Sequence, residues 1–359
     1  MKYMNKSLGF SFGMSLMVFG ALSSSNLWAG DASAKLTKAP TIERLKKNLF
    51  PIPPELRGSI FSYLNFGDLV ELYSSNKISS SDKIEIGRII PEAALRSSLG
   101  ELIEVHSSNK INDVAINAEI GQIILKKALG EFILLPEVTA QEAAALVQVV
   151  PNTSIREAIP AFRVAQTKTP VGLYYAVYGS FPDLAQVSDR NLDKGQIIAK
   201  WKANPELPLT FTTSDDDIAL ANRLSEMTGR RFSVTTNAQN EYSIRGRALV
   251  GEKPTGSITT STYYFGNEAA QLSNHAWFYS DSGGSTHGVN ENPSEHSHPF
   301  GLNQAIGNVF VRSSDGVLRG ASFSYDSGWY AESSYSVEGS AGVRYGGIGS
   351  RLAELIVTE

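Results

Sequence analysis

The last sixty residues break into short segments divided by glycine, and this spacing limits what the chain can fold into. Three of these segments read PFGLNQAIGNVF at 299–310, VLRGASF at 317–323 and IGSRLA at 348–353. Glycine at such intervals interrupts helices and strands and favours tight turns between short aromatic or β-branched runs. The pattern beyond Phe162 therefore predicts a loop-rich α+β domain.

The same three segments resemble, in order, the closing motifs of the formylglycine-generating enzyme (sulfatase-modifying factor) family. Those motifs are N-P-F-G-L-x-D-M-x-G-N-V-W-E-W, V-L-R-G-G-S-W and I-G-F-R. Residues 214–232 and 274–287 resemble further family motifs in the same order. The resemblance covers residues 155–359 and implies a C-type-lectin-like fold with little regular structure. It also implies that Arg319 and Arg351 lie in tertiary polar networks.

One clear helix is expected in this domain, from Asp215 to Met227. Ser214 is the candidate N-cap, and Gly229 is the candidate stop because glycine adopts the left-handed conformation that ends many helices. Three acids at 215–217 suit the positive end of the helix dipole. A solvated helix start is the expected role of these acids.

The oxidase chemistry of the family needs a cysteine pair, and this chain has no cysteine. The resemblance places the two cysteine positions on Tyr325 and Tyr330, whose phenols cannot bind a soft Cu(I) ion or form a disulfide. A second branch of the family, the iron-dependent sulfoxide synthases, needs an H-x3-H-x-E ligand set on added helices. The helical part of this chain has only His106. No catalytic residues are predicted.

The resemblance also implies a calcium site at Asn308, but the position of its carboxylate ligand holds Val311. The ligand set is incomplete, so no cofactor is expected. His296 and His298 would chelate a transition metal only if their loop folded back. Asn308, His296 and His298 are therefore the metal candidates, and structural roles are favoured for them.

Residues 323–345 are rich in Tyr, Trp, Ser, Gly and Asp and poor in aliphatic side chains. Rigid aromatic rings give contact area and small polar residues give adaptable hydrogen bonds, a composition typical of a recognition surface. The family places its site in this segment, and some diversity-generating retroelements place their variable residues there. The alternative is an ordinary loop whose rings cover a small core. The predicted ligand-binding residues are Tyr325, Asp326, Ser327, Trp329, Tyr330 and Tyr345.

Residues 41–150 carry helical spacing and an internal repeat. Residues 69–78 match 102–111 at an offset of 33, and a second match follows at an offset of 34. A period in the mid-thirties suits one helix–turn–helix unit per repeat. The sequence therefore predicts an all-α domain of two stacked helical hairpins, each with Ser-Ser-Asn-Lys at the turn between its helices.

The N-terminal residues indicate the cellular compartment. Residues 1–29 have the basic, apolar and small-residue order of a secretory signal, with cleavage as late as residue 34. A secreted or periplasmic protein is expected, with no stable membrane insertion after cleavage. Residues 52–72 also resemble an F-box, although the first helical hairpin of the repeat explains the same pattern. The net charge of −4 argues against a nucleic-acid partner.

The favoured function is a secreted, non-catalytic binding module whose lectin-like domain recognises a protein or glycan. Three alternatives stay open. The first is a family enzyme with non-cysteine chemistry, and the second is a host-directed effector with an F-box-like adaptor helix. The third is a variable display protein of the diversity-generating-retroelement type.

Overall fold

The computed structural model describes most of the chain beyond residue 60. The described residues are 61, 64–75, 78–108, 110–187, 192–292, 298–325 and 328–356. The predicted signal segment, most of the F-box-like segment and three candidate site residues (Asp326, Ser327 and His296) lie outside them and stay predictions. The chain divides into two compact units. The first holds the residues up to Ser97 with Lys110–Ile116, and the second holds Ser98–Asn109 with Asn117 onward.

In the first unit, helices α3 (Phe66–Ser74) and α4 (Ser80–Arg96) pack on each other. Each begins at a side-chain cap: Asn65 accepts the Asp68 N–H at 2.8 Å, and Ser79 accepts an N–H in the first turn of α4. Spacings of three and four residues place the apolar side chains on one face of each helix. The buried side chains include Phe66, Leu69, Leu72, Ile86 and Ile90.

The helix bounds follow the internal repeat. Helix α5 (Leu99–Ser107) begins and ends 33 residues after α3. Helix α6 (Val114–Leu129) begins 34 residues and ends 33 residues after α4. The first two residues of each Ser-Ser-Asn-Lys segment lie at the ends of α3 and α5. The equivalence of two stacked hairpins stays a prediction.

The second unit contains two small sheets. The larger has the strand order β1-β2-β7-β3 with antiparallel neighbours. Its strands are β1 (Phe132–Leu135), β2 (Phe162–Ala165), β7 (Leu352–Glu354) and β3 (Phe232–Val234). The smaller sheet has the order β5-β4-β6, with β4 parallel to β6. Its strands are β5 (Leu318–Arg319), β4 (Phe310–Arg312) and β6 (Ile348–Gly349).

The sequence predicts a domain boundary between residues 150 and 155. In the structure, residues 132–149 belong to the second unit. Strand β1 pairs along its whole length with β2, and helix α7 (Ala140–Val149) buries Ala143 and Leu146 in the core of that unit. A short apolar run such as 132–135 suits a strand as well as a helix, and only its partner strand decides between them.

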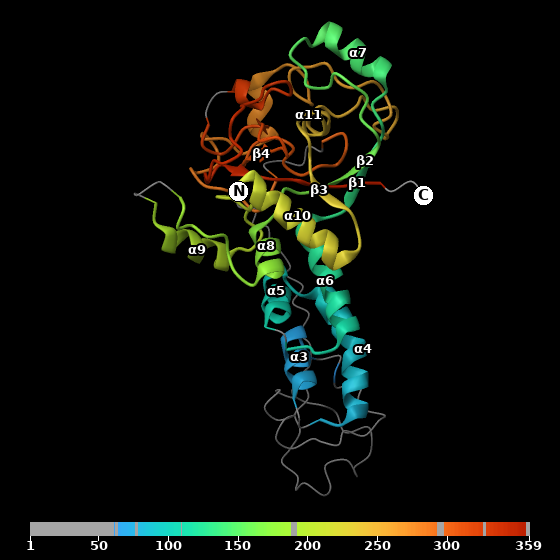
Figure 1. The fold of residues 1–359 in the computed structure, drawn as a ribbon, viewed down its shortest axis with the longest axis vertical. Coiled ribbons are helices and arrows are strands. Elements are labelled where there is room, and N and C mark those ends of the chain that lie inside the picture. Colours follow the sequence, from blue (N-terminus) through green and yellow to red (C-terminus); the bar gives the residue numbers. More distant parts are fainter. Residues whose placement is uncertain are drawn as a thin grey trace, which may run out of the picture. The chain divides into compact units, whose positions relative to one another are not determined.

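Helix α10 (Ser214–Thr228) is the expected principal helix, and it packs beside β3 (Figure 1). Its N-cap is Thr213 rather than Ser214, because Thr213 and Asp216 form a reciprocal capping box. Gly229 ends it in the left-handed conformation, with φ 70°. The expectation of a solvated acidic start is wrong for Asp217, which is fully buried and pairs with Arg312 at 3.2 Å.

The remaining elements of the second unit lie outside the two sheets. They are α8 (Val171–Tyr178), α9 (Lys194–Ala203), α11 (Asn237–Arg245) and two short 3-10 turns, η1 (Ala269–Asn274) and η2 (Gly328–Ala331). Short strands, several helices and long loops make this a mixed α and β fold, as predicted. No helix among the described residues is both long enough and apolar enough to cross a membrane.

Candidate recognition surface

A buried carboxylate, Glu241 of α11, lies at the centre of the polar frame in the second unit. Its oxygens accept hydrogen bonds from Thr153 Oγ1 at 2.8 Å and from the Ser154 N–H at 2.7 Å. They also pair with Arg245 at 2.7 Å and with Arg319 at 3.0 Å. Burial raises the pKa of Glu241, but Arg319, Arg245 and the hydrogen bonds from Ser154 together hold the pKa below its usual value. The carboxylate therefore stays charged and ties α11 to β5.

Arg319 extends this frame to the aromatic segment. Its Nη1 donates to the carbonyls of Ser333 at 3.0 Å and Tyr335 at 3.1 Å, and its Nε donates to Asn237 Oδ1 at 2.6 Å. Next to it, Leu318 and Val337 exchange two backbone hydrogen bonds of 2.8 and 3.0 Å. The predicted polar network of Arg319 is confirmed, and it fixes the backbone of residues 333–337.

Arg351 forms the second predicted network. Its Nη1 donates to the carbonyls of Ala165 at 2.9 Å and Gln166 at 2.6 Å, and its Nη2 donates to those of Asn303 at 2.7 Å and Gln304 at 3.3 Å. Burial lowers the pKa of Arg351 to about 9. This arginine joins β7 to the loop before β4 through carbonyl acceptors alone.

Four aromatic rings in mutual contact form what we call the aromatic cluster: Tyr325, Trp329, Tyr330 and Tyr335. Trp329 stacks on Tyr330 with ring centroids 3.9 Å apart and meets Tyr335 edge-on at 4.9 Å. Tyr325 lies 4.5 Å from Tyr330 and rests edge-on at 5.2 Å against Phe310 of β4, which is buried. Such offset and edge-to-face contacts hold aromatic side chains in place.

Exposure decides whether the cluster is core or surface. Trp329 is 47% exposed, whereas Tyr325 and Tyr330 are half-buried and pack against the hydrophobic core. The two tyrosines therefore lie between Trp329 and the core, and part of the Trp329 ring is exposed to solvent. Trp329 is therefore a surface residue, whereas Tyr325 and Tyr330 cover the core, as the ordinary-loop alternative describes.

Two further tyrosines adjoin the cluster. Tyr345 is 43% exposed, and its hydroxyl donates to Ser324 Oγ at 3.2 Å. Tyr279 is 62% exposed, and its backbone N–H donates to the Tyr325 carbonyl at 3.3 Å. The sequence reasoning missed Tyr279 and Tyr335. Composition of the 323–345 segment could have found Tyr335, but only the long-range backbone contact identifies Tyr279.

The start of α10 clamps the segment that carries Tyr345. Arg344 Nη1 pairs with Asp216 at 2.8 Å and donates to the Phe211 carbonyl at 2.9 Å. The Ser214 N–H donates to the Ala341 carbonyl at 2.8 Å. These contacts use the charge and the free N–H groups of a helix N-terminus to hold a loop.

Asn308, the calcium candidate, is fully buried in a left-handed turn with φ 59°. Its Oδ1 accepts the His287 N–H at 3.0 Å, and its Nδ2 donates to the His287 carbonyl at 2.8 Å and to Gln304 Oε1 at 2.7 Å. Val311, at the carboxylate position, is buried in β4. The Asn308 side chain thus bridges two loops in the way a structural asparagine does.

His298 is buried, and both ring nitrogens have partners inside the fold. Nε2 lies 3.0 Å from the Ile244 carbonyl, and Nδ1 accepts the Phe300 N–H at 3.2 Å. Burial lowers the pKa of His298 to about 4, which keeps the ring neutral. Within the described residues, no group of three or more His, Asp and Glu side chains is arranged to hold a metal ion.

Comparison with known proteins gives structural neighbours. No family model matches the chain, and no curated protein matches its sequence. Treponema denticola variable protein 1 is similar at 19% identity with a TM-score of 0.46, over 63% of this chain and 96% of that protein. PvdO from Pseudomonas aeruginosa is similar at 19% identity with a TM-score of 0.40, over 55% and 81%. CarF is similar at 14% identity with a TM-score of 0.38, over 56% and 88%.

Proposed function

We propose that residues 155–359 form a non-catalytic, lectin-like binding module of the formylglycine-generating enzyme type. Its ligand is a protein or glycan, and its ligand surface is the aromatic cluster with Tyr279 and Tyr345. The observation that carries the proposal is the exposure of Trp329 on stacked rings above a hydrogen-bonded frame. Rigid aromatic side chains bury large area at small entropy cost, which is why they dominate many recognition surfaces.

The absence of catalysis follows from the residues at the family's cysteine positions. Tyr325 and Tyr330 lie with ring centroids 4.5 Å apart, so the two positions are neighbours in space, as a cysteine pair would be. Burial raises the pKa of Tyr325. A neutral phenol neither supplies a thiolate nor ligates Cu(I), and two tilted rings in contact occupy the positions of the reactive sulfurs.

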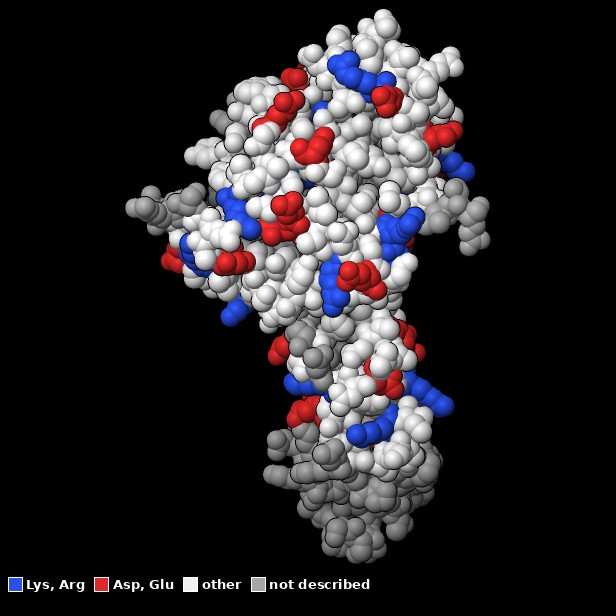
Figure 2. All heavy atoms as spheres, in the orientation of Figure 1, with Lys and Arg blue, Asp and Glu red and all other residues white. Residues whose placement is uncertain are grey.

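Charge favours a partner without strong charge of its own. Acidic and basic side chains are interspersed on the face drawn in Figure 2, and the net charge of the chain is −4. A polyanion would instead call for a basic stripe. We propose that the module acts after export, as the N-terminal signal pattern predicts.

A variable display protein is the second candidate, and one feature favours it. Arg319 holds the segment through the carbonyls of Ser333 and Tyr335, and Val337 pairs with Leu318 through the backbone. Backbone anchors do not depend on which side chains the segment carries. Sequencing the gene from independent isolates tests this: changes confined to the cluster positions support a display role, and an unchanged segment opposes it.

Binding is tested with the full-length protein on glycan and protein arrays. Trp329→Ala should weaken binding of the ligand found by about 2 kcal/mol or more. Tyr178→Ala is the matched control, since Tyr178 is 40% exposed on α8 and its ring contacts Tyr174 at 4.6 Å, outside the cluster. Equal binding by both variants would remove the cluster as the site. Conversion of a sulfatase-motif peptide to formylglycine by the wild-type protein would contradict the non-catalytic role.

A further inference from the structure

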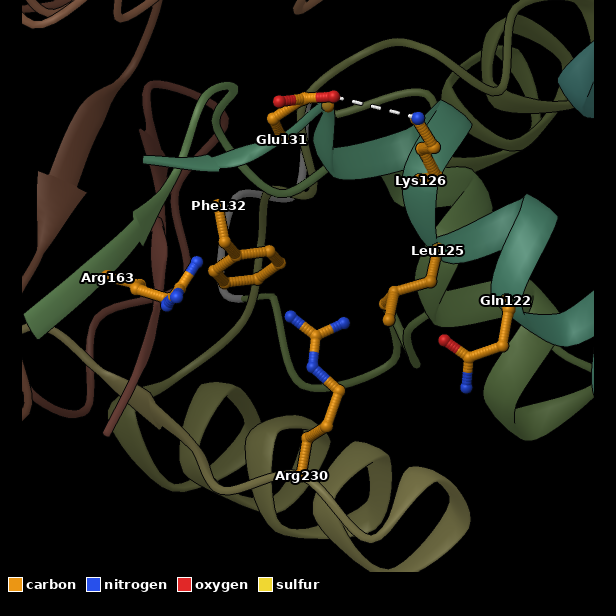
Figure 3. Close-up of a pocket in the computed structure, with 8 residues that line it drawn as sticks. Gln122, Leu125, Lys126, Glu131, Phe132, Arg163 and Arg230 are labelled. Carbon is orange, nitrogen blue, oxygen red and sulfur yellow. Dashed lines mark ion pairs between the residues drawn. The ribbon is translucent and has the colours of Figure 1, made fainter. Parts of the chain in front are cut away.

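A cavity of about 360 Å³ in the second unit is lined by three cationic side chains. Figure 3 shows Arg163 of β2 and Arg230, which follows α10, reaching toward the Phe132 ring, with Leu125 of α6 on another wall. The Arg230 guanidinium lies 4.9 Å from the centre of the Phe132 ring. Cations on an aromatic wall make this end of the cavity suited to an anion.

The three cationic side chains of this cavity differ in how closely an acidic side chain neutralises each of them. Arg230 makes a bidentate pair with Glu354 at 2.8 and 2.9 Å, and Lys126 lies 3.6 Å from Glu131. Arg163 is exposed and lies opposite Glu354 on the neighbouring strand, and its charge helps to lower the pKa of that carboxylate. Arg163 therefore shares Glu354 with Arg230, so two guanidinium groups face one strand carboxylate. This leaves donor capacity at Arg163 for a second carboxylate.

A second cavity, of about 240 Å³, lies between α5, α6, α8 and α10. Its walls are mostly apolar, and they include Leu173, Val177, Leu224 and Met227. Met227 is 47% exposed at the end of α10. His106 also lines this cavity, and burial lowers its pKa, which keeps the ring neutral. An exposed methionine beside an apolar hollow is suited to an aliphatic chain.

The two cavities adjoin each other along α6. Gln122 and Leu125 line both of them. From Asn117 to Lys126 the lining follows α6 for about 14 Å at the rise of an α-helix. Along α10 the lining of the apolar cavity runs from Leu224 to Thr228, and Arg230, which lines the cationic cavity, lies two residues further on. The two cavities thus share one wall on α6, with apolar side chains around one and cationic side chains around the other.

We propose that the two cavities form one groove, which binds an anionic amphiphile with a single aliphatic chain, of the fatty-acid class. The carboxylate binds the guanidinium of Arg163, beside Arg230 and Lys126. The chain runs along α6 past Leu125 into the apolar cavity beside Met227. An amphiphile uses both ends of the groove, whereas an inorganic anion leaves the apolar walls uncovered and a neutral hydrocarbon makes no use of the three cationic side chains. The groove shares no residue with the aromatic cluster, so this site does not depend on the proposed function.

The test is titration of the full-length protein with dodecanoate below its micelle concentration, followed by calorimetry. We expect saturable binding of one molecule, with at least tenfold weaker binding of dodecanol and of acetate. Arg163→Gln should weaken dodecanoate binding at least tenfold with little change in the unfolding midpoint, since Arg163 is exposed and Glu354 keeps its bidentate pair with Arg230. Arg231→Gln is the control, because it removes the same charge from an exposed neighbour outside the groove.

The apolar end needs its own variant. A side-chain carbon added at Gly121 of α6 meets only His106 Cε1, at 4.0 Å, so Gly121→Leu fills the cavity while it favours the helix. It should abolish dodecanoate binding and leave acetate unaffected. Acetate binding as tight as dodecanoate would reduce the site to an anion site and overturn the proposal. Absence of dodecanoate binding, or equal binding by Arg163→Gln, would overturn it as well.

Discussion

The frame around Glu241 and the aromatic cluster lie in the same unit, but different forces hold them. In the frame the charged side chains are buried and form ion pairs, as Glu241 does with Arg245 and Arg319. In the cluster, rings stack on one another and Trp329 stays exposed. Removing one member of a buried ion pair should therefore destabilise the whole fold, whereas removing an exposed ring should mainly weaken ligand binding. This contrast separates the residues that stabilise the fold from those proposed to bind the ligand.

The frame should show the largest effect on stability. Glu241→Gln leaves Arg319 and Arg245 buried without their counter-charge, and we expect a loss of about 3 to 5 kcal/mol in the free energy of unfolding. Denaturant melts of the full-length protein measure it. Arg223→Gln is the control, because Arg223 pairs with Glu226 at 3.0 Å on the exposed face of α10. A loss of about 0.5 kcal/mol or less is expected there. Similar losses in both variants would end the contrast.

The lowered pKa of buried His298 should make the stability of the fold depend on pH. The pKa of His298 falls from 6.5 to about 4 in the folded protein, so the unfolded chain takes up a proton first as the pH drops. The stability that neutral His298 contributes is complete above pH 6.5 and is lost as the pH falls toward 4. That loss is about 3 kcal/mol.

Asp217 acts in the opposite direction, so the histidine must be isolated by a variant. Burial raises the pKa of Asp217 from 3.8 to about 6, and its contribution to stability therefore rises as the pH falls through that window. Both wild type and His298→Gln contain Asp217, so its contribution cancels in the difference between their free energies of unfolding. This difference should shrink by about 3 kcal/mol between pH 7 and pH 4. A difference that stays constant with pH would refute a neutral buried His298.

The cluster should tolerate loss of its most exposed ring. Trp329→Ala removes a half-exposed side chain from the top of a stack, and we expect the free energy of unfolding to change by about 1 kcal/mol or less. A loss of about 3 to 5 kcal/mol would mean that Trp329 is a core residue. Thermal melts monitored by calorimetry distinguish the two.

The smallest effect should be local. Arg344→Gln removes the pair with Asp216, which is partly exposed, and global stability should fall by about 1 kcal/mol or less. Hydrogen exchange of the amides of residues 341–345 should become faster, because the clamp on the Tyr345 segment loosens. Unchanged exchange in this segment would show that backbone contacts alone hold it.

The sequence predicted features whose cause is local or carried by a motif. The helix 215–227 and the polar networks of Arg319 and Arg351 belong to this group. The burial of Asp217 escaped prediction, because nothing near it in sequence indicates that Arg312 lies across the fold. Strand β1 escaped for the same reason, since its partner β2 begins about thirty residues later. The proposed groove at Arg163 is lined by residues of α5, α6, β1, β2, α8 and α10 and by Arg230, so no single sequence motif predicts it.

The most direct test of the central claim compares one ligand on three proteins. The ligand is the strongest binder of the wild-type protein on a glycan or protein array, and the other two proteins are Trp329→Ala and Tyr178→Ala. The account predicts a dissociation constant raised at least thirtyfold, about 2 kcal/mol, for Trp329→Ala alone, with all three proteins equally folded. An unchanged dissociation constant for Trp329→Ala would contradict the claim that the aromatic cluster is the recognition surface.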